Sequence, residues 1–225
     1  MTRNLVLLTV CMGMLVAGCQ SADNMFSKFA GWHDLFNGQN LDGWKASENQ
    51  GTFTVNEDGV IVVHGERSHL FYAGPVRDAN FTNFEFKVDV MTTPGSNSGI
   101  FFHTAYQETG WPGQGYECQV NQTFQADPQK TGGLYNVVKI DAEHNPAKDN
   151  EWYTQHIIVR GKHVVVNIIT GIDSDKTTVH EVVDYTEPDP LDRRQPRLSS
   201  GTFALQGHDP KSLVYFKNVR VRVLR

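Results

Sequence analysis

The sequence predicts an all-β fold, a jelly-roll sandwich of two antiparallel sheets. Short apolar stretches, about a dozen in all, are separated by turn residues and follow no β-α-β rhythm. Beyond residue 18, no window of about twelve residues shows a convincing helical period. No Pro/Ser-rich linker or internal repeat divides the chain, so residues 33–225 are expected to form one domain.

The N-terminal residues have the pattern of a bacterial lipoprotein signal peptide. Arg3 gives a positive start, and residues 5–16 form an apolar core that is too short to span a bilayer. The run Leu15-Val16-Ala17-Gly18-Cys19 resembles a lipobox, in which the cysteine is acylated. We therefore expect a signal peptide over residues 1–18 and a lipidated Cys19 with its tether over residues 19–32. A simple signal peptide with a chance cysteine is the alternative.

A lipid anchor would attach the protein to a membrane of the bacterial cell envelope. Gln20 rather than Asp follows the cysteine, which favours the outer membrane, or a periplasm-facing position, in a Gram-negative host. Cys11 would leave with the signal peptide, so Cys118 would be the one thiol left and no intramolecular disulfide could form.

The charge balance argues against nucleic acid as a partner. The chain has 20 Lys and Arg against 25 Asp and Glu, a formal net charge of −5, and no basic run. Its length is that of one ordinary domain with a substantial core.

The expected strands follow one another between turn signals. Residues 56–59, Asn-Glu-Asp-Gly, form a strong hairpin turn, and Gly161-Lys162 form another. Outside the central stretch considered below, the expected strands cover residues 53–55, 60–63, 69–72, 83–90, 132–138, 152–160, 163–170, 179–184, 202–207 and 213–224.

Residues 83–90 show the clearest strand pattern. Phe84, Phe86, Val88 and Val90 alternate with charged residues of both signs, so one face should pack in the core and the other should meet water.

The central stretch, residues 96–121, contains two further strands and differs from that pattern. In its second strand, Cys118 lies on an apolar face as a core residue, whereas Glu117 and Gln119 lie on the opposite face. A carboxylate beside amides, next to a loop that carries Trp111, is typical of a sugar site, because amides bond hydroxyls and an aromatic ring covers a C–H face. The alternative is an outward polar face without a function.

Several short motifs along the chain are similar to those of the 3-keto-disaccharide hydrolase domain family. They are Leu35-Phe36-Asn37-Gly38 with Leu41-Asp42-Gly43-Trp44, Asn97-Ser98-Gly99-Ile100-Phe101-Phe102, Tyr116-Glu117-Cys118-Gln119-Val120, Gly133-Leu134-Tyr135, Glu151-Trp152-Tyr153, Ala204-Leu205-Gln206-Gly207-His208 and Val214-Tyr215-Phe216-Lys217-Asn218-Val219-Arg220. The resemblance implies a concanavalin-like sandwich that acts on oxidised glycosides. Two departures are His103, where the family commonly has Arg, and Ile169-Thr170-Gly171, where it commonly has a Leu-Asn-Gly turn.

A 3-keto sugar can lose its C1 substituent by elimination, because the ketone makes the C2 proton acidic. This route needs a base, an acid at the leaving oxygen and a donor for the enolate oxygen. Glu117 is the first candidate for the base, or for a metal or hydroxyl ligand; His208 and His103 follow, because histidine titrates near neutral pH. Either histidine could equally be a surface residue at a strand end.

Four polar residues are candidate binders of sugar hydroxyls: Gln119, Gln206, Asn97 and Tyr135. Trp111 could be a stacking platform or could cap the edge of the sandwich. A divalent metal could be held by Glu117 with His103 or His208, although no short ligand spacing requires one. The alternatives to an enzyme are a non-catalytic, lectin-like surface module that binds carbohydrate and a scaffold of the envelope.

Overall fold

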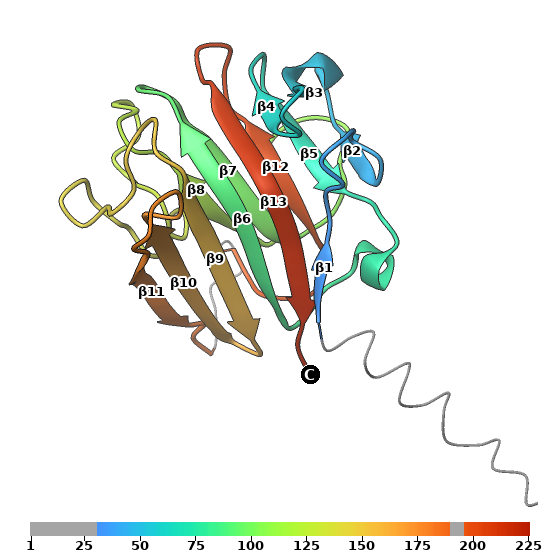
Figure 1. The fold of residues 1–225 in the computed structure, drawn as a ribbon. Coiled ribbons are helices and arrows are strands. Elements are labelled where there is room, and N and C mark those ends of the chain that lie inside the picture. The colour runs from blue at the N-terminus through green and yellow to red at the C-terminus, as the bar shows by residue number, and fades with distance from the viewer. Residues whose placement is uncertain (1–30, 190–195) are drawn as a thin grey trace, which may run out of the picture.

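The computed structural model describes residues 31–189 and 196–225, which form a concanavalin-like sandwich of two antiparallel sheets (Figure 1). This confirms the predicted fold class. In the described part of the chain, the helical elements are two short 3-10 turns, η1 (Gln50–Thr52) and η2 (Val76–Ala79). The predicted signal peptide, Cys19 and most of the tether lie outside the described residues. Trp32, expected at the end of the tether, is the first residue of a strand.

The larger sheet has eight strands, in the order β11-β10-β9-β6-β13-β4-β3, with β1 paired to β13. These strands are β1 (Trp32–Asp34), β3 (Phe53–Val55), β4 (Ile61–Val63), β6 (Phe84–Thr92), β9 (Tyr153–Arg160), β10 (His163–Thr170), β11 (Thr178–Thr186) and β13 (Val214–Val223).

The smaller sheet has five strands, in the order β2-β5-β12-β7-β8. They are β2 (Trp44–Ala46), β5 (Ser68–Tyr72), β12 (Thr202–Gly207), β7 (Ser98–Thr104) and β8 (Tyr116–Val120). Neighbours such as β12 and β5 are far apart in sequence, so this order depends on the crossovers between the sheets.

The core lies between the sheets and confirms the alternation predicted for residues 83–90. Phe86, Val88 and Val90 are fully buried, and the Phe86 ring lies 4.4 Å from that of Phe203 on the opposite sheet. The other face of β6 is less open than expected. Glu85 is buried there because it forms ion pairs, including one of 2.6 Å with Arg222.

The predicted strand over residues 132–138 is wrong. Residues 132–135 run beside β8, where Gly132 N–H donates to the carbonyl of Gln119 and Tyr135 N–H to that of Glu117, each at 2.9 Å. The chain then turns back, because Asn136 adopts a left-handed conformation with φ of +58° and Val138 N–H bonds Leu134. Isolated bridges at Leu134 replace the expected strand.

The two faces of the smaller sheet have different environments. Tyr116, Cys118 and Val120 point into the core and are buried, as the alternation predicted. The face away from the core carries Glu117 and Gln119 on β8 and their neighbours on β7, β12 and β5. Over residues 31–189 and 196–225, no helix is long and apolar enough to cross a membrane.

Candidate active site

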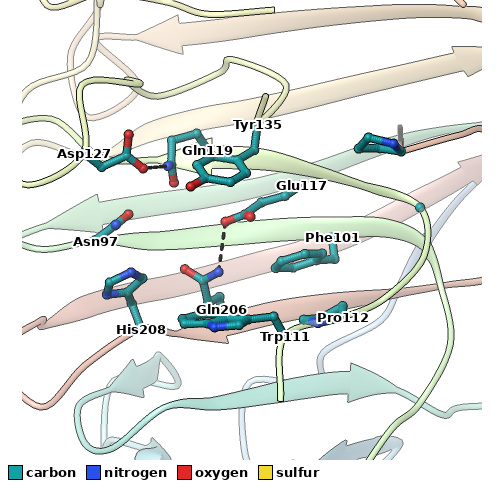
Figure 2. Close-up of a pocket in the computed structure, with 12 residues that line it drawn as sticks. Asn97, Phe101, Trp111, Pro112, Glu117, Gln119, Asp127, Tyr135, Gln206 and His208 are labelled. Atoms are coloured by element: carbon teal, nitrogen blue, oxygen red, sulfur yellow. Dashed lines mark hydrogen bonds between the residues drawn. The ribbon is translucent and has the colours of Figure 1, made fainter. Parts of the chain in front are cut away.

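A pocket of about 360 Å³ lies on this outer face of the smaller sheet (Figure 2). It is lined by Asn97, Phe101, Trp111, Pro112, Gly115, Glu117, Gln119, Asp127, Tyr135, Pro196, Gln206 and His208. Seven of the eight predicted site residues are in this set, and they come from β8, β12 and the segments that flank β7, β8 and β12. The structure therefore gathers side chains that are up to about 110 positions apart in the sequence.

Glu117 lies at the centre of the pocket wall. The Gln206 side-chain amide donates a hydrogen bond of 2.9 Å to Oε1 of Glu117. Burial raises the pKa of Glu117 to about 8; the bond from Gln206 opposes this shift, and the nearby charge of Asp127 adds to it. A carboxyl group with so high a pKa is a much stronger base, once ionised, than an exposed glutamate.

Gly99 on β7 makes room for the Glu117 side chain. A Cβ atom at residue 99 would lie 2.9 Å from both Cγ and Cδ of Glu117, closer than real Cβ atoms come to other atoms. The glycine of the Asn97-Ser98-Gly99 motif thus fixes where the carboxylate lies.

We expect Gly99→Ala to reduce any activity of this pocket by about 10²-fold, because displacement of a reacting group by roughly 1 Å has that effect. Gly51→Ala is the matched control, since a Cβ there meets nothing within 4 Å. Steady-state rates of the two purified variants, with melting curves to confirm folding, test this expectation. Equal rates for wild type and Gly99→Ala would contradict it.

His208 follows β12 and is oriented by its neighbour in sequence. Its Nδ1 lies 2.7 Å from Oδ2 of Asp209, which also accepts a 2.9 Å bond from the hydroxyl of Ser212. Burial alone would raise the pKa of Asp209, but these bonds and the bond from the Lys211 N–H lower it. An ionised Asp209 keeps the proton on Nδ1, so Nε2 is the atom that His208 can offer to a ligand.

Gln119 is positioned by Asp127, a residue that the sequence pattern did not indicate. The Gln119 amide donates to Oδ2 of Asp127 at 2.8 Å, while its carbonyl oxygen accepts the Val120 N–H at 3.0 Å. The loop that carries Asp127 is held by the buried Lys130 ammonium, which donates to the backbone carbonyls of Phe124 and Asp127 at 3.0 and 3.1 Å. Because Asp127 lies in an irregular loop, no strand periodicity could have predicted its position.

Polar atoms that lack a partner mark the binding surface. Within the described part of the chain, Oδ1 of Asn97 and Oε1 of Gln206 are buried and accept no hydrogen bond. Buried polar atoms are rarely left unsatisfied, so these oxygens are suited to receive hydroxyl donors from a bound molecule. Tyr135 adds a hydroxyl; burial raises its pKa, and the charges of Asp127 and Glu117 act in the same direction.

Trp111 and Phe101 form the apolar side of the pocket. The Trp111 ring is 48% exposed, and its centroid lies 5.4 Å from that of His208. An exposed indole can stack on the C–H face of a pyranose, and the neighbouring amides and carboxyl group can form hydrogen bonds with its hydroxyls.

Residues 31–222 match the model of the 3-keto-alpha-glucoside-1,2-lyase-like domain. The chain belongs to this family. A search of curated protein sequences found no match.

Solved structures with the same fold include proteins of carbohydrate metabolism and recognition. A Parabacteroides distasonis protein, provisionally assigned as a glycosyl hydrolase, has a TM-score of 0.67 and 22% identity, covering 93% of this chain and 99% of that one. Carbohydrate binding module CBM66 from Bacillus subtilis has a TM-score of 0.54 and 14% identity over 80% and 95% of the chains. The exoplasmic/lumenal domain of VIP36, in its Ca2+/Man2-bound form, has a TM-score of 0.57 and 11% identity over 81% of each.

His103 does not reach the pocket. It is 1% exposed, its Nε2 lies 2.9 Å from the Thr82 carbonyl, and its Nδ1 accepts the Ser199 N–H at 3.1 Å. Burial lowers its pKa. Strict alternation along β7 would put His103 on the same face as Phe101, but its φ of +56° breaks that alternation, so the candidate role of His103 in the pocket is not supported. His103 is a structural residue.

Of the two histidines predicted as possible metal partners of Glu117, His208 lines the pocket and His103 does not. Among the residues that the structure describes, no group of three or more His, Cys, Asp or Glu side chains is arranged to hold a metal ion.

Proposed function

We propose that this protein cleaves 3-keto-glycosides by removing the C2 proton, with Glu117 as the base. The observation that carries this proposal is a carboxyl group with a pKa raised to about 8 inside a pocket of sugar-binding character. The proton beside a ketone is a weak acid, so a base of raised pKa is better matched to it than an ordinary carboxylate. The lyase-like family to which the chain belongs supports the same reaction class.

The steps follow from the positions of the side chains. Glu117 takes the C2 proton, and the C–H electrons form an enolate whose oxygen, at C3, can accept a bond from the Tyr135 hydroxyl or the Asn97 amide. The enolate then re-forms the ketone, a C1=C2 double bond forms, and the bond from C1 to the leaving oxygen breaks. His208, in its doubly protonated form, gives the proton on Nε2 to the departing oxygen. Water that adds its hydroxyl to C1 would return a proton to Nε2 while Glu117 returns its proton to C2, which completes a net hydrolysis.

The rate should depend on pH in the direction set by Glu117. Only the ionised carboxylate can act as a base, and its raised pKa leaves it mostly protonated below about pH 8. We expect exchange of the C2 proton with solvent deuterium, which needs the base but not the acid, to become faster as the pH rises through this value and then to level off. An exchange rate that is flat or falls between about pH 6 and 9 would contradict the role of Glu117 as base.

A second candidate function is carbohydrate binding without cleavage. It is favoured by the unsatisfied amide oxygens of Asn97 and Gln206 and by a fold shared with a carbohydrate binding module. Binding alone, however, gives no reason for a buried carboxyl group of strongly raised pKa. The raised pKa leaves the group mostly protonated near neutral pH, whereas the ionised form is the stronger acceptor for sugar hydroxyls.

The two candidates are separated by incubation with 3-keto-trehalose, 3-keto-sucrose and simple 3-keto-glucosides. Release of 3-keto-glucose, or of the unsaturated ketone that precedes it, supports the enzyme. A protein that binds these sugars with measurable heat but leaves them intact over long incubation would be the lectin-like module.

We further propose that the protein acts at a membrane of the cell envelope, anchored through Cys19. The lipobox-like run before Cys19 supports this. Cys19→Ala should move the protein from the membrane fraction to a soluble fraction, as followed by fractionation and immunoblotting. An unchanged membrane fraction would count against the anchor.

A further inference from the structure

His69 is a buried histidine next to the pocket, and within the described residues neither of its ring nitrogens has a hydrogen-bond partner. It lies on β5, directly opposite Gln206 of β12 in the sheet register. Burial is the main cause that lowers its pKa to about 4, so the ring is neutral and carries one N–H donor and one bare acceptor. A purely structural site would be more stable with an apolar side chain, because both nitrogens have lost water without gaining a partner.

The Trp111 side chain separates His69 from the open pocket. The two ring centroids are 5.6 Å apart and nearly perpendicular, and the Phe101 ring contacts His69 from another side at 5.3 Å. Trp111 belongs to the exposed loop between β7 and β8. If Trp111 moved aside, the pocket would extend over His69 and towards Phe71. The centroid of the Tyr106 ring, in the same loop, lies 5.4 Å from that of the Phe71 ring.

The loop is held by polar contacts at several points. Glu48 N–H donates to the Glu108 carbonyl at 2.9 Å, Lys45 Nζ lies 3.7 Å from the centroid of the Tyr106 ring, and the Gln107 amide donates to the Trp111 carbonyl at 2.8 Å. Oε1 of Glu48 accepts the Gly110 N–H at 3.1 Å and the Arg67 Nε–H at 2.8 Å, and the Arg67 guanidinium lies 5.2 Å from the centroid of the Trp111 ring. Trp111 and Tyr106 remain 48% and 38% exposed. The exposed Trp111 ring, over a buried and unpartnered imidazole, is a cover that a ligand must displace to reach His69.

We propose that His69 is a sugar-binding residue of a second compartment of this pocket, which Trp111 covers in the free protein and which receives the leaving group of the glycoside. This inference rests on the proposed function, because that function defines the leaving group. Figure 2 shows Tyr135 and Gln119 on one side of Glu117, and Gln206, His208 and Trp111 on the other. The acid at the leaving oxygen thus lies on the Trp111 side, so the leaving group extends towards His69.

The chemistry of this compartment fits a second pyranose. Vicinal hydroxyls each donate and accept, which matches the one donor and one acceptor of neutral His69. Phe71 and Phe101 form an apolar floor for a C–H face, together with Ala204. The compartment therefore selects disaccharides over glycosides with a small leaving group.

The test compares two substrates, 3-keto-trehalose and methyl 3-keto-glucoside, in wild type and His69→Leu. We expect the ratio of kcat/KM for the disaccharide to kcat/KM for the methyl glycoside to fall by about 10-fold or more, the effect of losing hydrogen bonds to a bound sugar. His69→Asn, which keeps a donor and an acceptor, should restore part of the ratio. The melting temperature of His69→Leu should be equal to or above that of wild type. An unchanged ratio in folded His69→Leu overturns the proposal.

His103→Leu is the matched control for loss of a buried imidazole. It breaks the bonds to Thr82 and Ser199, so it should lower the melting temperature and leave the substrate ratio unchanged. A fall of the ratio in His103→Leu as large as that in His69→Leu would show that any loss of a buried histidine has this effect, and would overturn the proposal.

Binding measurements keep this inference separate from the proposed function. If wild type cleaves neither substrate, the proposed reaction is wrong, and titration of tryptophan emission with 3-keto-trehalose decides the inference alone, with Trp111→Phe to assign the signal. Tighter binding of the disaccharide to wild type than to His69→Leu, with a change in Trp111 emission, supports the second compartment. Equal binding by the two proteins, or no change in Trp111 emission, overturns it.

Discussion

Replacing Glu117 by Gln should reduce cleavage of a 3-keto-glycoside by about 10²–10⁴-fold, the usual contribution of a positioned acid–base group. Glutamine keeps the size of the side chain and can still bond Gln206, but it cannot take a proton. The fold should survive, because Glu117 lies on the face of the sheet that is turned away from the core. Initial rates at saturating and at low substrate concentration measure the effect on kcat and on kcat/KM.

Glu57→Gln serves as the control for this variant, because Glu57 lies in an exposed turn between β3 and β4. It should have wild-type rates. Near-wild-type turnover by a folded Glu117→Gln protein would contradict the assignment of the base and would transfer that role to His208.

Replacing Phe86 by Ala should lower the free energy of unfolding by about 3–5 kcal/mol. Phe86 is fully buried and stacks on Phe203 of the opposite sheet, so truncation removes contacts on both sides of the core. Urea denaturation of wild type and variant gives the difference.

Phe86→Leu keeps most of the buried volume and should cost less than about 1.5 kcal/mol. A loss below about 1 kcal/mol for Phe86→Ala would mean that residue 86 does not pack between the sheets as the structure has it.

The strands were predictable where one face is core and the other is polar. The alternation over Phe84–Val90 placed Phe86 and Val88 inside, and the same rule separated Cys118 from Glu117. The rule failed at residues 132–138 and at His103. In both places, a non-glycine residue adopts positive φ, at Asn136 and at His103 itself, and sequence periodicity carries no signal for that conformation.

The candidate site was predictable as a set of residues but not as an arrangement. Glu117, Gln206 and His208 could be singled out because of their polar character on otherwise apolar strands and their family motifs. Their proximity depends on the strand order β12-β7-β8, which is fixed by crossovers that local pattern does not encode. Asp127 escaped prediction because it lies in an irregular loop, and His69 because its place beside Gln206 depends on the pairing of β5 with β12.

If Glu117 removes the C2 proton, cleavage should show a kinetic isotope effect at that position. Rates of wild type on a 3-keto-glycoside with hydrogen or deuterium at C2 would be compared at pH values below and above about 8. We expect a normal primary isotope effect on kcat/KM where proton removal limits the rate. We also expect that cleavage is strongly reduced for both substrates in Glu117→Gln. Equal rates for the two substrates under all conditions, with Glu117→Gln still cleaving at the wild-type rate, would contradict this role of Glu117.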